Sequence, residues 1–152
     1  MHCGTDWRLL AGKDSGETFY DNSENLHDLA VFEHPIEAQY ACKTIMGWPK
    51  LMAEVWTVDA EGRHSIGGYG VLTLPFSPGE YELSMAMWRP EGSAYDRALS
   101  YFLGANPELK HKDVVLSGND RFGMQTVSTG NLMVRVGVIV KDFHLHGISL
   151  KA

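Results

Sequence analysis

The segment from Gly67 to Gly92 most strongly limits how this chain can fold. After the turn sequence Pro75-Phe76-Ser77-Pro78-Gly79, apolar side chains recur at every second position, which is the period of a β-strand and not of a helix. Proline has no amide hydrogen to donate to a ladder and glycine tolerates positive φ, so this turn is typical of a connection between antiparallel strands. The segment predicts a β-hairpin. The apolar face of its second strand is formed by Tyr81, Leu83, Met85 and Met87.

Strand patterns occupy most of the remaining chain. Residues 36–41 alternate, residues 51–58 are rich in β-formers, and residues 59–62 supply turn chemistry. The clearest alternation lies near the C-terminus, where one predicted face is polar except for Ile139 and the other is half-buried. That half-buried face is formed by Leu132, Val134, Val136, Val138 and Val140.

A single helix is predicted over residues 93–103. Ser93 followed by Asp96 is similar to a capping box, and Gly104 is a typical stop residue. The apolar residues at helical spacing are Tyr95, Leu99, Phe102 and Leu103. Many short strands with Gly and Pro turns and one helical insertion favour an all-β, antiparallel β-sandwich over a parallel sheet.

Length and composition favour one domain over residues 1–152. A chain of 152 residues with 44% hydrophobic and 21% charged residues is sufficient for one core. The two cysteines, Cys3 and Cys42, form no metal or redox motif, so reduced thiols in an intracellular protein are expected, with Cys42 buried in a strand. No apolar run reaches the roughly 20 residues that a membrane span needs, and no signal sequence is seen.

Several functions are disfavoured. A net charge of −6 with scattered basic residues argues against nucleic acid as a partner. Residues 68–73 lack the third glycine of a dinucleotide-binding loop. Residues 118–123 have the glycine spacing of a phosphate-binding loop, but the Lys and the hydroxyl residue that should follow are missing. No nucleophile elbow is present. We therefore expect no catalytic residues, no cofactor and no enzymatic activity.

Metal sites are also disfavoured. His144 and His146 would share one face of an extended segment, but no third ligand has diagnostic spacing, although the chain has 7 histidines. Two loops offer a few oxygen ligands for calcium, which takes about six to eight. The sequence lacks the dense Asp-x-Asp pattern of calcium-binding C2 domains. The loop candidates are Asp59, Glu61, Asn119 and Asp120.

Five residues are candidates for contacts with other molecules. Trp88 and Arg89 are residue types that often anchor interfaces, although a core position is favoured for Trp88. Tyr69, between two glycines, is a candidate for presentation at a sheet edge. Lys110 and Lys112 flank a histidine in a small basic segment, read either as a solvated loop or as a lipid or phosphate contact. Trp48 and Trp56 are predicted to be core residues.

Motifs spread over the whole chain resemble the B9 domain family. They include Gly68-Tyr69-Gly70, the turn at residues 75–79 and Trp88-Arg89-Pro90-Glu91-Gly92-Ser93, in that order. Outside this segment the resemblance continues through Trp7-Arg8-Leu9-Leu10, His34-Pro35-Ile36, Gly47-Trp48-Pro49, Val55-Trp56 and Ser117-Gly118-Asn119-Asp120-Arg121-Phe122. The resemblance implies a C2-like sandwich. The resemblance also implies about 25 to 30 residues before the segment that matches Met1, so one or two first strands of the family are expected to be lacking here.

The resemblance also implies a function. B9 proteins are subunits of the Meckel syndrome, or tectonic-like, complex at the ciliary transition zone, where they serve cilium assembly and the membrane diffusion barrier. It implies a cytoplasmic, cytoskeleton-associated, non-enzymatic scaffold at the basal body that bridges B9 domain-containing protein 1 and the Meckel syndrome type 1 protein, with membrane lipid or tubulin as further contacts. The alternative is a C2-type module that docks on phospholipid, with calcium dependence less favoured.

Overall fold

The structure is a computed structural model that describes residues 1–22, 29–93, 95, 98, 102, 106–118 and 122–147, with the backbone alone described at His146. It separates into two compact units, Met1–Pro49 and Lys50–Ala152. Each unit contains one antiparallel sheet. The predicted all-β class is therefore confirmed.

The first unit is built on a two-stranded sheet. Strands β1 (Trp7–Gly12) and β2 (Ala38–Cys42) pair antiparallel, with an irregularity between Leu9 and Ala11. Trp7 packs edge-on against Trp48, with ring centroids 5.1 Å apart, and its indole Nε1 donates to the Met46 carbonyl at 2.8 Å. Trp48 is thus a packing residue, as predicted.

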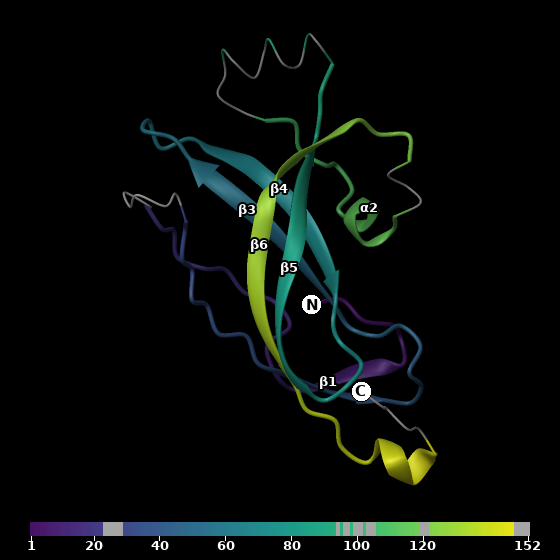
Figure 1. Cartoon of the computed structure of the whole chain (residues 1–152). Coiled ribbons are helices and arrows are strands. Elements are labelled where there is room, and N and C mark those ends of the chain that lie inside the picture. The colour runs from purple at the N-terminus through teal and green to yellow at the C-terminus, as the bar shows by residue number, and fades with distance from the viewer. Residues whose placement is uncertain are drawn as a thin grey trace. The chain divides into compact units, whose positions relative to one another are not determined.

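The second unit holds a four-stranded sheet, whose strands lie alongside one another in Figure 1. Its order is β3-β4-β5-β6, so β4 and β5 are inner strands and β3 and β6 form the edges. The bounds are Lys50–Val58 for β3, His64–Thr73 for β4, Gly79–Pro90 for β5 and Thr126–Val138 for β6. A short helix, α2 (Asp113–Leu116), and a 3-10 turn, η1 (Phe143–His146), complete the described elements.

The hairpin predicted around the 75–79 turn is present as the β4–β5 pair. Tyr69 and Trp88 are register partners, so both side chains point to the same face of the sheet. They form the core of this unit with Ile66 and Val115, all four less than 8% exposed.

The opposite face of the sheet is apolar because of the two-residue period of β5. Met85 and Met87 are 1% and 4% exposed and lie against Gly70. A Cβ at Gly70 would come within 2.4 Å of the Met87 sulfur, which explains why no larger residue fits there.

The C-terminal alternation is confirmed in β6, which begins earlier and ends sooner than residues 132–140. Leu132, Val134, Val136 and Val138 are half-buried, whereas Met133 is 63% exposed. Ile139, the residue that did not fit a polar face, is 96% exposed immediately after the strand.

Other expectations need correction. Trp56 is 44% exposed, so its prediction as a core residue is wrong, because it lies on the edge strand β3, whereas its register partner Ile66 on the inner strand β4 is fully buried. Cys42 is half-buried, and burial raises the pKa of its thiol.

The structure also bears on the predicted helix at residues 93–103 and on the segment with His144 and His146. Within residues 93–103, the described positions Tyr95, Ala98 and Phe102 are helical, and the prediction otherwise lies outside the described residues. Residues 143–146 form a 3-10 turn, so the extended conformation assumed for His144 and His146 is wrong. The helix α2 was not predicted.

Candidate interaction surface

Residues 106–117, here called the tethered segment, lie over the sheet of the second unit. Its first attachment is Asn106, whose Nδ2 donates to the Ile66 carbonyl at 3.0 Å. The Oδ1 of the same side chain accepts a hydrogen bond from Arg89 Nη1. Arg89 is half-buried and therefore helps to hold the segment on the sheet.

The second attachment is made by Tyr69. Its hydroxyl oxygen accepts a hydrogen bond from the amide of Leu109 at 3.1 Å, and its ring lies 6.0 Å from that of Trp88. Tyr69 is 1% exposed on an inner strand, so the expectation that it is presented at a sheet edge is wrong. Edge strands need at least one free side, and β4 has β3 on one side and β5 on the other.

Helix α2 provides the apolar attachment. Val115 is 4% exposed and belongs to the cluster formed by Ile66, Tyr69 and Trp88. Partly buried residues complete this packing, namely Met52, Val71, Leu109 and Met124. Trp88 is accordingly a core residue, which is the alternative that the sequence favoured for it.

An ion pair holds the middle of the tethered segment to the edge strand β3. Lys112 Nζ lies 2.8 Å from Glu54 Oε2 on β3, and hydrogen bonding to this carboxylate raises the pKa of the Lys112 ammonium. The lysine side chain is 55% exposed, so the pair contributes at most about 1 kcal/mol to stability. Lys110 is exposed two residues earlier. The structure thus brings the five candidate residues to one region, with Tyr69 and Trp88 below the segment and the lysines on its surface.

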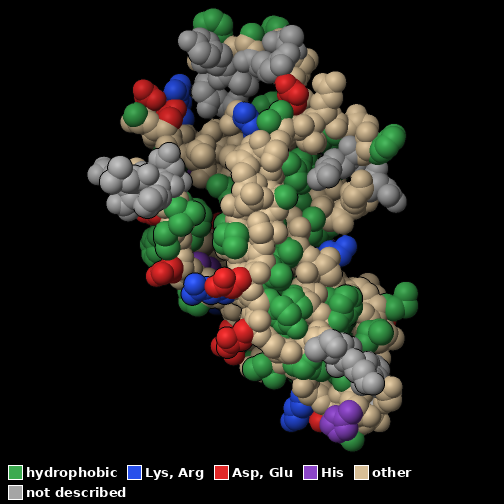
Figure 2. Space-filling view, viewed as in Figure 1, with side chains coloured by type: hydrophobic (Ala, Val, Ile, Leu, Met, Phe, Trp, Pro, Cys, Tyr) green, Lys and Arg blue, Asp and Glu red, His purple; other side chains and the backbone are tan. Residues whose placement is uncertain are grey.

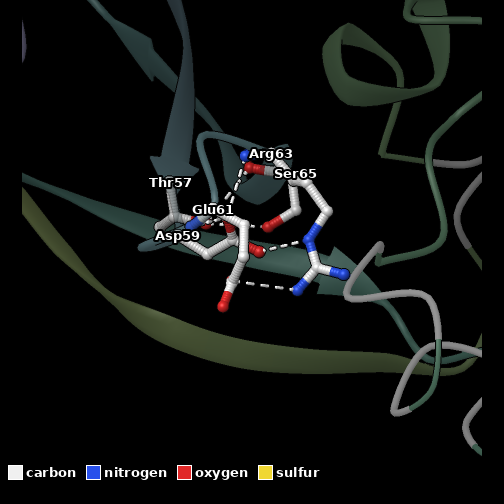
Figure 3. A network of polar contacts seen from close by, with 5 residues as sticks. All are labelled: Thr57, Asp59, Glu61, Arg63 and Ser65. Atoms are coloured by element: carbon white, nitrogen blue, oxygen red, sulfur yellow. Dashed lines mark hydrogen bonds and ion pairs between the residues drawn. The ribbon is translucent and has the colours of Figure 1, made fainter.

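The loop that joins β3 to β4 is fixed by its own polar contacts, which Figure 3 shows from close by. Asp59 Oδ1 accepts hydrogen bonds from the amides of Glu61 and Arg63 at 3.0 and 2.8 Å. Asp59 Oδ2 lies 2.6 Å from Arg63 Nε, and Arg63 Nη2 reaches Glu61 at 3.2 Å. The backbone hydrogen bond from Arg63, followed by its side chain, lowers the pKa of the Asp59 carboxyl.

We expect Asp59 to titrate below its ordinary pKa of 3.8 in an NMR pH titration of its carboxyl carbon. The loop stability linked to this carboxylate is then present at neutral pH and is lost as the pH falls through the lowered pKa. Arg63→Gln keeps the backbone amide, which is the largest cause, so the pKa should return only part of the way. A pKa at or above the ordinary value in the wild-type chain would contradict the geometry.

The same contacts bear on the calcium candidates. Both oxygens of Asp59 already accept hydrogen bonds, and Arg63 places a positive charge where a cation would bind. Asn119 and Asp120 lie outside the described residues. Across the described side chains, no three His, Cys, Asp or Glu residues are grouped so that they could hold a metal ion. None of the helices in the described part of the chain is long and apolar enough to span a membrane.

Two residues of this surface were not foreseen from the sequence. Asn106 precedes Pro107, a pattern that signals a turn but does not reveal that both ends of its amide are used. Glu54 is 58 positions away from its partner Lys112, so no local pattern could have paired them. Both residues matter because they fix the tethered segment at its beginning and in its middle.

The matches to known proteins cover almost the whole chain. The family model described as "Ciliary basal body-associated, B9 protein" matches residues 1–139. B9 domain-containing protein 2 is 36% identical in Homo sapiens and 38% identical in Danio rerio, each over 97% of this chain and 84% of the relative. B9 domain-containing protein 1 of Homo sapiens is 30% identical over 95% of this chain and 72% of its own length. No solved structure matches the chain.

An all-β chain with two antiparallel sheets and these relatives is a B9-type module. The chain belongs to the ciliary basal body-associated B9 protein family.

Proposed function

We propose that this chain is a non-enzymatic scaffold subunit of a heteromeric complex of B9-domain proteins at the ciliary transition zone. Its place is the cytoplasmic, cytoskeleton-associated side of the basal body, where it serves cilium assembly and the membrane diffusion barrier. In this role it bridges B9 domain-containing protein 1 and the Meckel syndrome type 1 protein, with membrane lipid or tubulin as further contacts.

The observation that carries this proposal is the extent of the family match. The family model matches residues 1–139 and the alignment with B9 domain-containing protein 2 takes in 97% of the chain, which supports a role shared with B9 proteins. The similarity to B9 domain-containing protein 1 supports a common architecture for two members of one assembly. A twisted sheet that carries a fixed surface segment suits a binding platform, because the groups that contact a partner are held in place before binding.

The tethered segment is the docking surface that we propose for a partner. It is attached to the sheet by the Asn106 side chain, which donates to Ile66, and by the Leu109 amide, which donates to Tyr69. Its outer surface presents Lys110 and Lys112, of which Lys112 is paired with Glu54. Exposed cations on a fixed segment provide electrostatic complementarity to an acidic partner surface. Arg89, half-buried beneath Asn106, contributes by positioning this segment.

Co-purification with tagged B9 domain-containing protein 1 and the Meckel syndrome type 1 protein tests the assembly. We expect both to be recovered with the wild-type chain. Lys110→Glu combined with Lys112→Glu should lower their affinity about tenfold or more, because like charges across an interface cost several kcal/mol and about 1.4 kcal/mol is tenfold in affinity.

Lys13→Glu combined with Lys141→Glu is the matched control, since it makes the same charge change at two exposed lysines outside the tethered segment. Equal binding by the lysine double variant and the wild type would exclude the tethered segment as the docking surface. Failure of the wild-type chain to bind either partner would exclude the assembly role itself.

The second candidate function is docking on a phospholipid surface through the same exposed lysines. Sedimentation with anionic vesicles, with and without calcium, tests it with the same variants. Because Asp59 is engaged with Arg63, calcium-dependent sedimentation is not expected from the β3–β4 loop. Calcium-independent sedimentation that the lysine double variant abolishes would favour this candidate over the protein assembly.

A further inference from the structure

The two lysines of the tethered segment differ in what they contact. The Lys112 ammonium lies 2.8 Å from Glu54 Oε2 on β3, whereas Lys110 is exposed and forms no ion pair with any described residue. We propose that Glu54 competes with an acidic partner for Lys112, so that the chain holds back one of its two docking cations until the partner displaces Glu54. This inference rests on the proposed function, because it concerns the regulation of the same docking surface.

The place of Glu54 follows from the register of the β3–β4 pair. Glu54 lies opposite Tyr69, so both side chains point to the face of the sheet that the tethered segment covers. The side chain of Glu54 is 19% exposed, and that of Lys112 is 55% exposed. The carboxylate is therefore mostly covered, and the lysine is the member of the pair that a partner can reach.

The tethered segment stays on the sheet without this ion pair. Asn106 and Leu109 are attached by part-buried hydrogen bonds of 3.0 and 3.1 Å, and Val115 is 4% exposed in the core. An ion pair that involves an exposed lysine adds little to these attachments. Replacing the Glu54 carboxylate by an amide should therefore free the Lys112 ammonium and leave the segment in place.

Competition follows from the contact that Lys112 already makes. A partner carboxylate must break the pair with Glu54 before it can form its own, and it then lies near a second carboxylate that repels it. Figure 2 shows the Lys and Arg side chains of one face scattered singly, several of them beside acidic side chains, with no broad basic patch. Without such a patch, the state of one cation changes the attraction for a partner measurably.

The first test needs no partner. The full chain is labelled with limiting acetic anhydride, and tandem mass spectrometry compares Lys112 with Lys110 as the internal standard. The hydrogen bond to Glu54 raises the pKa of the Lys112 ammonium, and only the unprotonated amine reacts. Lys112 should therefore react about twofold to fivefold faster in Glu54→Gln than in the wild type, which is the range that an exposed ion pair supplies. An unchanged ratio would exclude the restraint by Glu54.

The second test measures the affinity for B9 domain-containing protein 1, the proposed partner, by isothermal titration calorimetry. Glu54→Gln should lower the Kd about twofold to fivefold, because Lys112 no longer has to be released. This gain should vanish in a Lys112→Gln background, where no ammonium is left to free. The same gain in both backgrounds would mean that Glu54 acts by repulsion alone, and the competition would be excluded.

Glu82→Gln is the matched control for both tests. Glu82 Oε1 lies 2.9 Å from Arg135 Nε, so this variant also removes one negative charge and frees one cation, outside the tethered segment and outside β3 and β4. It should leave the labelling ratio and the Kd unchanged. Equal effects of Glu54→Gln and Glu82→Gln would reduce the result to a change in net charge and overturn the proposal.

Two further outcomes separate this inference from the proposed function. Weaker binding by Glu54→Gln, with faster hydrogen exchange of the Leu109 amide, would show that Glu54 positions the segment and does not compete. Absence of binding by the wild type and Glu54→Gln alike, although the labelling ratio changes as expected, would exclude the docking role and with it the release of Lys112 by a partner. Wild-type binding that Glu54→Gln leaves unaltered would exclude the competition alone.

Discussion

Replacing Trp88 with alanine is expected to lower the free energy of unfolding by about 3 to 5 kcal/mol. The side chain is 7% exposed and packs against Tyr69, with ring centroids 6.0 Å apart. Removing the indole leaves a cavity below the tethered segment, because its neighbours Ile66 and Val115 are fixed in β4 and α2 and can fill the space only in part. Urea denaturation followed by far-ultraviolet circular dichroism measures the loss.

Trp56→Ala is the control for this prediction. Trp56 has the same side chain but is 44% exposed, so we expect its replacement to cost about 1 kcal/mol or less. Equal losses in the two variants would show that Trp88 is not a core residue. Trp88 is buried and cannot contact a partner directly. If Trp88→Ala binds a partner less well near its unfolding transition, the cause is therefore a smaller fraction of folded protein.

Gly12→Ala is expected to destabilise the first unit by roughly 2 to 5 kcal/mol. The residue has φ of +85°, where a side chain costs about 1 to 2 kcal/mol. A Cβ there would lie 2.1 Å from the Glu37 carbonyl oxygen, which also accepts a hydrogen bond from Lys13, so the β1–β2 pair must shift at a cost of about 1 to 3 kcal/mol. Denaturation monitored through the near-ultraviolet signal of Trp7 and Trp48 would detect the change.

Gly62→Ala separates the two causes. Gly62 has φ of +77° but no atom within 4 Å of the added Cβ, so it experiences the backbone strain without the clash. We expect it to cost only about 1 to 2 kcal/mol. If Gly12→Ala cost no more than Gly62→Ala, the close approach of Glu37 would be irrelevant to stability.

The strands that were predicted correctly are those whose signal is local. The turn at residues 75–79 combines two prolines and a glycine, and the alternation on both of its sides sets the phase of β4 and β5. In β6 the same rule identified the half-buried row from Leu132 to Val138. Period and turn chemistry act over a few residues, so the sequence alone reveals them.

The incorrect predictions depend on which parts of the sheet are covered. Alternation places Tyr69 and Trp56 on strands but does not tell whether another segment lies above them. The tethered segment covers Tyr69 and leaves Trp56 44% exposed, and this choice depends on contacts between residues about 40 positions apart. The sequence therefore predicted which residues belong to the candidate site. Only the structure reveals that Tyr69 and Trp88 are buried supports, whereas Lys110 and Lys112 are exposed.

The order in which these contacts form also has a consequence. Asn106 and Leu109 each bond a residue 40 positions earlier on β4, so the tethered segment can dock only after the hairpins of the sheet have assembled. The last contacts to form are commonly among the first to open, and opening here would bring two aromatic rings into water without breaking a single strand pair. In this open state, exposed aromatic rings would make the chain prone to aggregation and to binding by chaperones. Its amide hydrogen exchange would nevertheless remain native throughout the sheet.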